Sequence, residues 1–335
     1  MRQRLDRVVL GDGTVVAYAT AGVGRPLVYV MGWLTHLRLG WELAAERALY
    51  EALAPGCRLV RYDRAGCGLS PAVERPASLA FELEQLGAVA ATLGEPFDLM
   101  GTSMGAPVAV AWAAQNPDSV RRLVLYGGWA RGDELSLPAV RENVLGLVEA
   151  HWGLGSDVLT DIFAPDADRA TRAELARYQR ACSTAATARA LLALSYELDV
   201  TGYLGRVRSP TLVVHRDGDR AAPVAQARVL AEGIGGAQLA VLPGRSHLPY
   251  AGDRDELVRV VRRFLGLSVP RRRADGLTAR QLEVAELVSQ GCTNREIAVR
   301  MGIDERSAEG HVERIRLRLG FRSRAQIAAW FSERR

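Results

Sequence analysis

The sequence predicts an α/β fold with a doubly wound, mostly parallel sheet and a helical lid, followed by a small all-α domain. Three observations support this prediction. In the first part of the 335-residue chain, short apolar runs alternate with longer helical patterns, as in βαβ units. A long helical interval interrupts this alternation once. The last part instead holds closely spaced helix starts and the positive charge excess, since residues 270–335 contain 14 Arg but only 9 acidic residues.

The sheet domain is expected to begin with a hairpin, because Gly11-Asp-Gly13 separates two strand-like runs, 7–10 and 14–20. Six further strands are expected from mostly continuous apolar runs, at 26–30, 58–62, 97–102, 120–126, 211–215 and 237–242. Helical patterns lie between them, at about 41–53, 79–93, 104–116, 223–234 and 253–265. Continuous apolar strands suit a sheet that helices cover on both faces.

No strand pattern appears between residues 127 and 209, a stretch rich in Ala, Leu and Arg. Since a loop of this length is rarely without structure, we expect a helical lid at about 127–209, inserted into a sheet domain of residues 1–265. Gly, Pro and consecutive arginines mark 266–273 as a linker. In the following domain, residues 274–335, helices are expected to begin with capping boxes at Thr278, Thr293 and Ser323.

The composition excludes several classes of protein and of site. Apolar residues make up 48% and charged residues 24%, which is ordinary for a globular chain. All 43 basic residues are arginine, so a phosphate-binding P-loop lysine, a Schiff-base lysine and a Ser-Lys dyad are excluded. The four cysteines are scattered, which indicates a reducing environment without a disulfide framework or a metal site. No cofactor is expected.

No apolar run approaches the ~18 residues that would span a bilayer. The first residues, Met1-Arg-Gln-Arg-Leu-Asp-Arg7, contain no apolar segment of the kind that signal peptides carry. We therefore expect a cytoplasmic protein that does not bind membranes.

A candidate nucleophile, Ser103, lies between an expected strand and an expected helix. The sequence Gly101-Thr-Ser-Met-Gly105 has the form G-x-S-x-G, follows the run 97–102 and opens the pattern 104–116. This context is typical of a nucleophile elbow, in which glycines allow a tight turn and the serine hydroxyl stands above the sheet edge.

A serine nucleophile needs a base and an acid that orients the base. In the context of a nucleophile elbow, the order along the chain is serine, then the acid, then the histidine. His247 is the candidate base, on the loop after the last strand, and Asp219 is the candidate acid, on the loop before it, with Asp217 as a close competitor. His215 ends a strand and is more typical of a structural role, whereas His36 could line the same pocket. The base would take the serine proton, and the acid would hold the imidazole tautomer.

An oxyanion hole requires two N–H donors directed at the developing negative charge. The residue after the nucleophile, Met104, would supply one. The loop after the run 26–30 would supply the other, with Trp33 as the donor and Gly32 allowing close approach.

With these motifs in place, residues 1–265 resemble the α/β-hydrolase superfamily. The resemblance rests on the elbow, on the acid and histidine loops, and on Tyr62-Asp-Arg-Ala-Gly-Cys-Gly-Leu-Ser70 after the next strand. Where the family commonly has His-Gly, this chain has Met31-Gly32, which removes a side chain that usually braces the oxyanion loop. The fold also serves as a receptor with a silent triad, so binding and hydrolysis both stay open. The lid and several tryptophans indicate a covered, apolar pocket (Trp33, Trp41, Trp129 and Trp152).

Residues 274–335 resemble the LuxR-type helix-turn-helix. The matching residues are Leu277-Thr278, Glu283-Val284, Gln290-Gly291, Thr293-Asn-Arg-Glu-Ile-Ala298, His311, Arg318-Leu-Gly320 and Arg322-Ser-Arg-Ala325. The resemblance implies a supporting helix at 293–301, a turn at Gly302 and a recognition helix at 305–319 in the major groove of duplex DNA. The candidate DNA-binding residues are Thr293, Asn294, Arg295, Arg306, Ser307, Glu309, Gly310, Glu313 and Arg314.

The helix-turn-helix departs from its family at one common DNA-contacting position. The usual Thr-Val-Lys reads Ser307-Ala-Glu309 here, so an acidic residue stands where the family has a lysine. A carboxylate can accept from cytosine but repels phosphate, so the DNA site of the family is not inherited. The alternative for this basic module is a charged helix pair that contacts protein.

Together, these features predict a transcriptional regulator. The hydrolase-like domain would sense, and may hydrolyse, a small apolar or ester-like molecule, and the resemblance implies action as a homodimer on DNA. The alternative is an active serine hydrolase of the esterase type whose helix-turn-helix has an accessory role.

Overall fold

The computed structural model describes residues 1–269, 277 and 279–333. The chain divides into two compact units, Met1–Val269 and Pro270–Arg335. Residues 270–273 of the expected linker and the capping box expected at Thr278 lie outside the described residues.

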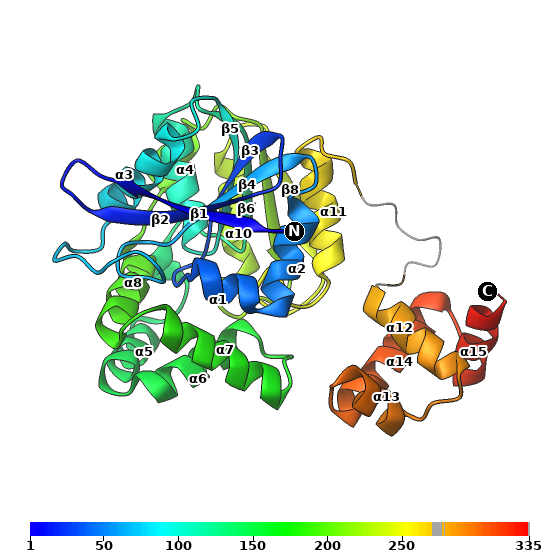
Figure 1. The fold of residues 1–335 in the computed structure, drawn as a ribbon. Coiled ribbons are helices and arrows are strands. Elements are labelled where there is room, and N and C mark those ends of the chain that lie inside the picture. The colour runs from blue at the N-terminus through cyan, green and yellow to red at the C-terminus, as the bar shows by residue number, and fades with distance from the viewer. Residues whose placement is uncertain (270–276, 278, 334–335) are drawn as a thin grey trace. The chain divides into compact units, whose positions relative to one another are not determined.

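The first unit contains an eight-stranded sheet in the order β1-β2-β4-β3-β5-β6-β7-β8 (Figure 1). The strands are β1 Gln3–Val9, β2 Val15–Ala21, β3 Arg25–Val30, β4 Cys57–Tyr62, β5 Phe97–Thr102, β6 Val120–Tyr126, β7 Thr211–Arg216 and β8 Gln238–Leu242. The expected hairpin is confirmed, because β1 pairs antiparallel with β2, and β2 also pairs antiparallel with β4. All other pairs are parallel. The carboxyl ends of six strands therefore meet at one edge, where the loops that bear the candidate site begin.

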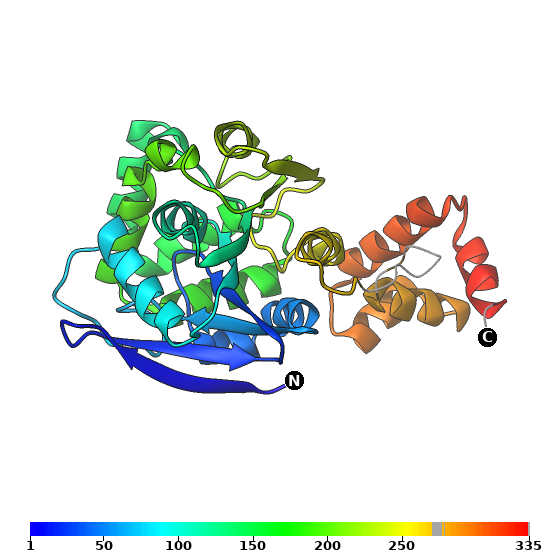
Figure 2. The same cartoon turned by 90° about the horizontal axis from the view of Figure 1, so that it is seen from above.

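Helices cover both faces of this sheet, as the continuous apolar strands predict (Figure 2). One core joins strand residues such as Val28 to α3 Leu79–Ala91, α4 Gly105–Gln115 and α10 Val224–Gly233. The other joins strand residues such as Leu27 to α2 Ala44–Leu53 and α11 Arg254–Phe264. Successive residues of a strand point to opposite faces, so each buried strand supplies both cores.

One expected helix, 41–53, is wrong as a single element. The structure has α1 Leu37–Glu42 and α2, separated at Leu43, whose backbone is extended with ψ of 108°. Because Leu43 packs against Ala164 and Leu175, its tertiary contacts outweigh the local helical pattern.

The interval between β6 and β7 is helical, as expected. It contains α5 Pro138–Ala150, α6 Trp152–Phe163, α7 Arg169–Cys182 and α8 Ala185–Glu197, preceded by a short 3₁₀ turn, Gly132–Glu134, and followed by α9 Thr201–Leu204. Leu159 and Leu191 of these helices share a buried cluster with Trp33 and Met104, so the lid packs directly over the elbow. Leu204 of α9 instead belongs to one of the two cores that the sheet forms with its covering helices. The chain therefore returns from the lid to the sheet at α9.

The second unit is a small helical domain. Its helices are α12 Ala279–Ser289, α13 Asn294–Met301, α14 Glu305–Leu319 and α15 Arg324–Ser332. The capping boxes expected at Thr293 and Ser323 are confirmed. Gly302 and Gly320 end α13 and α14 in the left-handed conformation, with φ of 64° and 69°. Ile297, Ala308 and Ile315 are among the apolar side chains of a single small core.

Candidate active site and DNA-binding helices

Ser103 lies on a sharp turn between β5 and α4. Its φ is 54°, and among the described residues it is the only one other than glycine with a positive φ. The flanking glycines are required by packing. A Cβ at Gly101 would lie 2.4 Å from the carbonyl oxygen of Gly105, and a Cβ at Gly105 would lie 2.1 Å from that of Val30. The G-x-S-x-G pattern therefore builds a tight turn, with the serine held in a conformation that side chains rarely adopt.

The structure brings Ser103, His247 and Asp219 together in one hydrogen-bonded chain. The Ser103 hydroxyl is 2.7 Å from His247 Nε2, and His247 Nδ1 is 2.7 Å from Asp219 Oδ2. The Asp219 side chain is completely buried, and its Oδ1 accepts hydrogen bonds from the backbone N–H groups of Ala221 and Ala222. Burial opposes ionisation of Asp219, yet the charge and hydrogen bond of His247 hold the pKa of that carboxyl below its usual value.

The competing acid and histidines have other partners. Asp217 is exposed and accepts a hydrogen bond from the Gly244 N–H at 2.9 Å, so Asp219 is the acid of this chain. His215 is buried, with its Nε2 2.9 Å from the carbonyl oxygen of Ala222, as its expected structural role implies. His36 caps α1 and does not line the cavities at Ser103.

The loop that carries His247 is tied to the lid. The His247 backbone N–H donates to the carbonyl oxygen of Phe163, the last residue of α6, at 2.8 Å. The hydroxyl of Ser246 donates to the same oxygen at 3.2 Å. The Phe163 and His247 rings also lie 5.6 Å apart between centroids. The position of the base therefore depends on a residue of the lid.

Both expected oxyanion donors lie beside the nucleophile. The backbone N–H groups of Trp33 and Met104 have no acceptor within the described part of the chain. A Cβ at Gly32 would lie 3.6 Å from the Ser103 Cβ, which shows how closely this loop approaches the elbow. A tetrahedral oxyanion formed at Ser103 would require two such uncommitted donors.

A buried ion pair holds the oxyanion loop, and the sequence analysis missed it. Arg64 donates to the carbonyl oxygens of both Met31 and Gly32, with a distance of 2.9 Å to the former. Its Nε donates to Glu82 on α3 at 2.7 Å, and both side chains are at most 2% exposed. Arg64 lies inside the motif at 62–70, so the residue was visible, but no local pattern links it to this loop.

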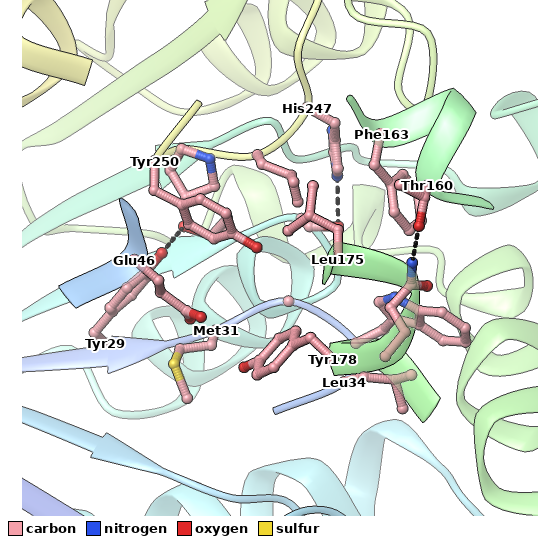
Figure 3. Close-up of a pocket in the computed structure, with 17 residues that line it drawn as sticks. Tyr29, Met31, Leu34, Glu46, Thr160, Phe163, Leu175, Tyr178, His247 and Tyr250 are labelled. Atoms are coloured by element: carbon pink, nitrogen blue, oxygen red, sulfur yellow. Dashed lines mark hydrogen bonds between the residues drawn. The ribbon is translucent and has the colours of Figure 1, made fainter. Parts of the chain in front are cut away.

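Two cavities meet at Ser103. The first, of about 80 Å³, is lined by Glu46 of α2, by Tyr178 of α7 and by Tyr250 among others, as Figure 3 shows. The second, of about 230 Å³, lies under the lid and is lined by apolar residues such as Trp129 and Leu159. Residues at both are Trp33, Ser103, Phe163 and His247.

The expected tryptophans are divided between pocket and core. Trp33 and Trp129 line cavities, while Trp152 packs edge-on against Trp33 at 6.1 Å between centroids. Trp41 does not line either cavity and stacks on Tyr50.

In the second unit, α13 and α14 form the expected helix-turn-helix. Of the candidate DNA-binding residues, the exposed charged ones are Arg295, Arg306, Glu309, Glu313 and Arg314. Glu313 is paired with Arg316, whose Nε donates to it at 2.8 Å. Local structure occupies three others, since Thr293 forms a capping box, Ser307 bonds to the N-cap Asp304, and Asn294 accepts from Arg324.

Gly310 is half-buried on α14, and a Cβ there would touch only the end of the Arg314 side chain. Within the described residues, no group of three or more His, Cys, Asp or Glu side chains could hold a metal ion, and no helix is long and apolar enough to cross a membrane.

Comparison with known proteins assigns both units. Residues 25–252 match the alpha/beta hydrolase fold, and residues 275–331 match the luxR family of bacterial regulatory proteins. A pyrrolizixenacetamide deacetylase from Xenorhabdus hominickii is 28% identical over 272 residues, covering 78% of this chain and 98% of the relative. A pimeloyl-[acyl-carrier protein] methyl ester esterase from Chromobacterium violaceum is 28% identical over 259 residues, covering 73% and 96%.

Solved structures show the same fold. A bromoperoxidase from Bacillus anthracis aligns with a TM-score of 0.69 and 22% identity, over 78% of this chain and 100% of its own. An esterase from Exiguobacterium antarcticum aligns with a TM-score of 0.68 and 20% identity, over 78% and 98%. The chain belongs to the alpha/beta hydrolase fold family and joins that domain to a LuxR-type DNA-binding domain.

Proposed function

We propose that this protein is a transcriptional regulator whose hydrolase-fold unit binds and hydrolyses a small, largely apolar ester or amide, and thereby controls DNA binding by the second unit as a homodimer. The observation that carries the catalytic part is the chain of two 2.7 Å hydrogen bonds through Ser103, His247 and Asp219. This alignment is what activation of a serine by a general base requires.

The chemistry follows from the positions of the three side chains. Ser103 Oγ attacks the carbonyl carbon while His247 Nε2 takes the hydroxyl proton. The oxyanion forms beside the free N–H groups of Trp33 and Met104. His247 then gives the proton to the leaving alcohol or amine, and water releases the acid from Ser103 by the same route. Buried Asp219 stabilises the imidazolium that each step creates.

The class of substrate is supported by the cavities and by the relatives. The cavity under the lid is lined mostly by apolar side chains, which suits a small apolar ligand. The two curated relatives described above are named as a deacetylase and a methyl ester esterase. Both names describe hydrolysis of an acyl compound, which is the reaction that this triad would perform.

The DNA-binding part rests on the exposed arginines of α13 and α14. Arg295, Arg306 and Arg314 are exposed and have no ion-pair partner among the described residues. Such cations are available to phosphates. These phosphate contacts would supply affinity, while Glu309 would bias the choice of bases.

Labelling with a serine-reactive fluorophosphonate, read by intact mass, tests the catalytic part. We expect one adduct on the wild type and none on Ser103→Ala. Ser195→Ala is the matched control, because this serine also lines a cavity at the site but donates to the Leu191 carbonyl oxygen at 2.9 Å. It should label like the wild type. Absence of an adduct on folded wild-type protein would indicate a receptor with a silent triad.

The regulatory part is tested with the same reagent. DNA binding by the full chain is measured over a range of salt concentrations, with and without the adduct on Ser103. A regulator should show a steep salt dependence and an affinity that changes when the pocket is filled, because coupling between two sites is reciprocal. An adduct that leaves DNA affinity unchanged would favour an enzyme with an accessory DNA-binding domain.

A further inference from the structure

A buried carboxyl stands in the first cavity, away from the triad, and the proposed reaction does not use it. Glu46 of α2 lines this cavity together with Ser103 and is only 6% exposed. Its Oε1 accepts a hydrogen bond from the Tyr50 hydroxyl. Its Oε2 has the Tyr178 hydroxyl beside it but makes no hydrogen bond of ordinary geometry with the described residues. A buried polar atom without a full set of partners is destabilising, so its presence at a cavity needs a reason.

The surroundings of Glu46 favour a ligand group that donates a hydrogen bond. Figure 3 shows its carboxyl directed into the cavity, with Tyr29, Tyr178 and Tyr250 around it and His247 at a different part of the wall. Apolar side chains make up much of the remaining wall of this cavity, among them Leu34, Leu175, Leu248 and Pro249. A ligand that reaches from Ser103 to Glu46 would therefore be apolar along its length and polar at its end.

The charge near Glu46 selects a neutral donor over a cationic one. The guanidinium of Arg61 lies 3.7 Å from the ring centroid of Tyr50, which is itself bonded to Glu46. Arg61 is 1% exposed and makes no ion pair with the described residues. An ammonium group at Glu46 would place a second positive charge beside this buried one, whereas a hydroxyl adds none.

We propose that Glu46 is a specificity-determining residue that binds a neutral hydroxyl group at the far end of the ligand. The substrate class would then be an ester or amide with an apolar chain that ends in a hydroxyl. This inference rests on the proposed hydrolytic function, because it places the reacting carbonyl at Ser103. It assigns one further recognition group to that site.

Binding to the Ser103→Ala variant measures this preference without turnover. Calorimetry compares ethyl esters of ω-hydroxy acids with ethyl esters of the matching unsubstituted acids, over a series of chain lengths. A second series carries the hydroxyl on the alcohol part of acetate esters. At the length that reaches Glu46, the hydroxylated member of one series should bind about tenfold more tightly than its plain partner. An ω-amino member should bind no better than the plain ester.

Two substitutions at Glu46, each made in the Ser103→Ala background, test the residue itself. Glu46→Met keeps the length of the side chain without its polar atoms and should abolish the tenfold preference. Glu46→Gln can still bond a hydroxyl and should retain most of it. Thr160→Val is the matched control, because Thr160 lines the same cavity but already bonds to the Ser156 carbonyl oxygen and to Gln179. The control should keep the preference.

The outcomes separate this inference from the proposed function. A hydroxyl preference in binding, with no turnover by the wild type, would support the role of Glu46 and overturn hydrolysis. Turnover of plain and hydroxylated esters with equal kcat/KM, and equal affinities in both series, would overturn the role of Glu46 and leave hydrolysis in place. If Glu46→Met does not fold, the comparison of hydroxylated with plain esters on the Ser103→Ala variant, in which Glu46 is unchanged, still tests the proposal. Preference for the ω-amino ester would overturn the assignment of a neutral group.

Discussion

Arg64 donates a hydrogen bond to the backbone carbonyl of Met31 at 2.9 Å. The same guanidinium also bonds to the Gly32 carbonyl and to the buried Glu82. Arg64 therefore holds the loop that carries Trp33 through the carbonyl oxygens of the two residues before Trp33. Met31 stands where the hydrolase family commonly has a histidine, and the Arg64–Glu82 pair supplies a brace that does not depend on that side chain.

Replacing Arg64 should damage both stability and reactivity. Arg64→Met leaves Glu82 as an unpaired buried charge, so we expect the free energy of unfolding to fall by about 3–5 kcal/mol in urea titrations. The exposed pair of Arg75 and Glu84 provides the control. Arg75→Met should cost much less stability, because solvent screens the ion pairs of Arg75 with Glu84 and Asp12.

A double substitution separates the two roles of Arg64. Arg64→Met with Glu82→Leu removes both charges, so most of the lost stability should return. Fluorophosphonate labelling of Ser103 should stay slow, because the carbonyls of Met31 and Gly32 have still lost their donor. Wild-type labelling rates in the double variant would show that the pair has only a structural role.

Asp219→Asn should preserve the fold but remove the acceptor that orients His247. The resulting loss in kcat/KM for an activated ester should be roughly 10⁴-fold, as for other triads. Asp217→Asn, on the same loop, should keep wild-type activity, because Asp217 is exposed and its side chain bonds only to the Gly244 N–H among the described residues. Equal losses in the two variants would contradict the assignment of the acid.

The lowered pKa of Asp219 also predicts a pH dependence of stability. A carboxyl with a depressed folded-state pKa contributes stability that is fully present above its unfolded pKa of about 3.9. This contribution is lost as the pH falls through the folded-state pKa. The difference in free energy of unfolding between wild type and Asp219→Asn should thus shrink as the pH falls below about 4. A difference that does not shrink in this acid range would contradict the lowered pKa.

Alanine scanning of two glycines should give opposite results. Gly105→Ala would place a Cβ 2.1 Å from the Val30 carbonyl oxygen, so we expect a large loss of thermal stability or no folded protein. Gly146→Ala in α5 meets no atom within 4 Å and should stabilise the protein by about 0.4–1 kcal/mol. Melting curves of the two variants check this, and tolerance of Gly105→Ala would mean that the elbow is not held as described.

In the second unit, Arg314→Ala should weaken DNA binding and reduce the salt slope by about one, since the exposed guanidinium would neutralise one phosphate. Arg280→Ala is the control, because Arg280 bonds to Glu283 and to the Met301 carbonyl oxygen. The control should keep the wild-type slope. The measurement is the affinity of the full chain for duplex DNA across salt concentrations.

The elements with strong local patterns were predictable from the sequence. β5 and β6 have the bounds that their apolar runs indicate, and Thr293 and Ser323 begin helices as their capping boxes require. The nucleophile, base and acid could be chosen because their order along the chain and their loops agree with one fold. Each of these signals lies within a few neighbouring residues.

The features that local patterns missed depend on contacts between distant segments. Arg64 braces a loop 32 residues away in sequence, and Glu46 faces a cavity built by six separate segments. The break at Leu43 is set by its packing against Leu175 of the lid. Hydrophobic periodicity and capping rules carry no information on such contacts, because these arise only when the sheet and lid assemble.

The hydrogen bond from the His247 backbone to Phe163 would make the proposed reaction depend on the position of the lid. A lid that opens far enough to move Phe163 also removes the acceptor that holds the base. When a molecule enters through an open lid, His247 would not be held in position to accept the proton of Ser103. The site would become reactive only after the lid has closed over the ligand. Ser103 would therefore not be activated while water fills the open pocket.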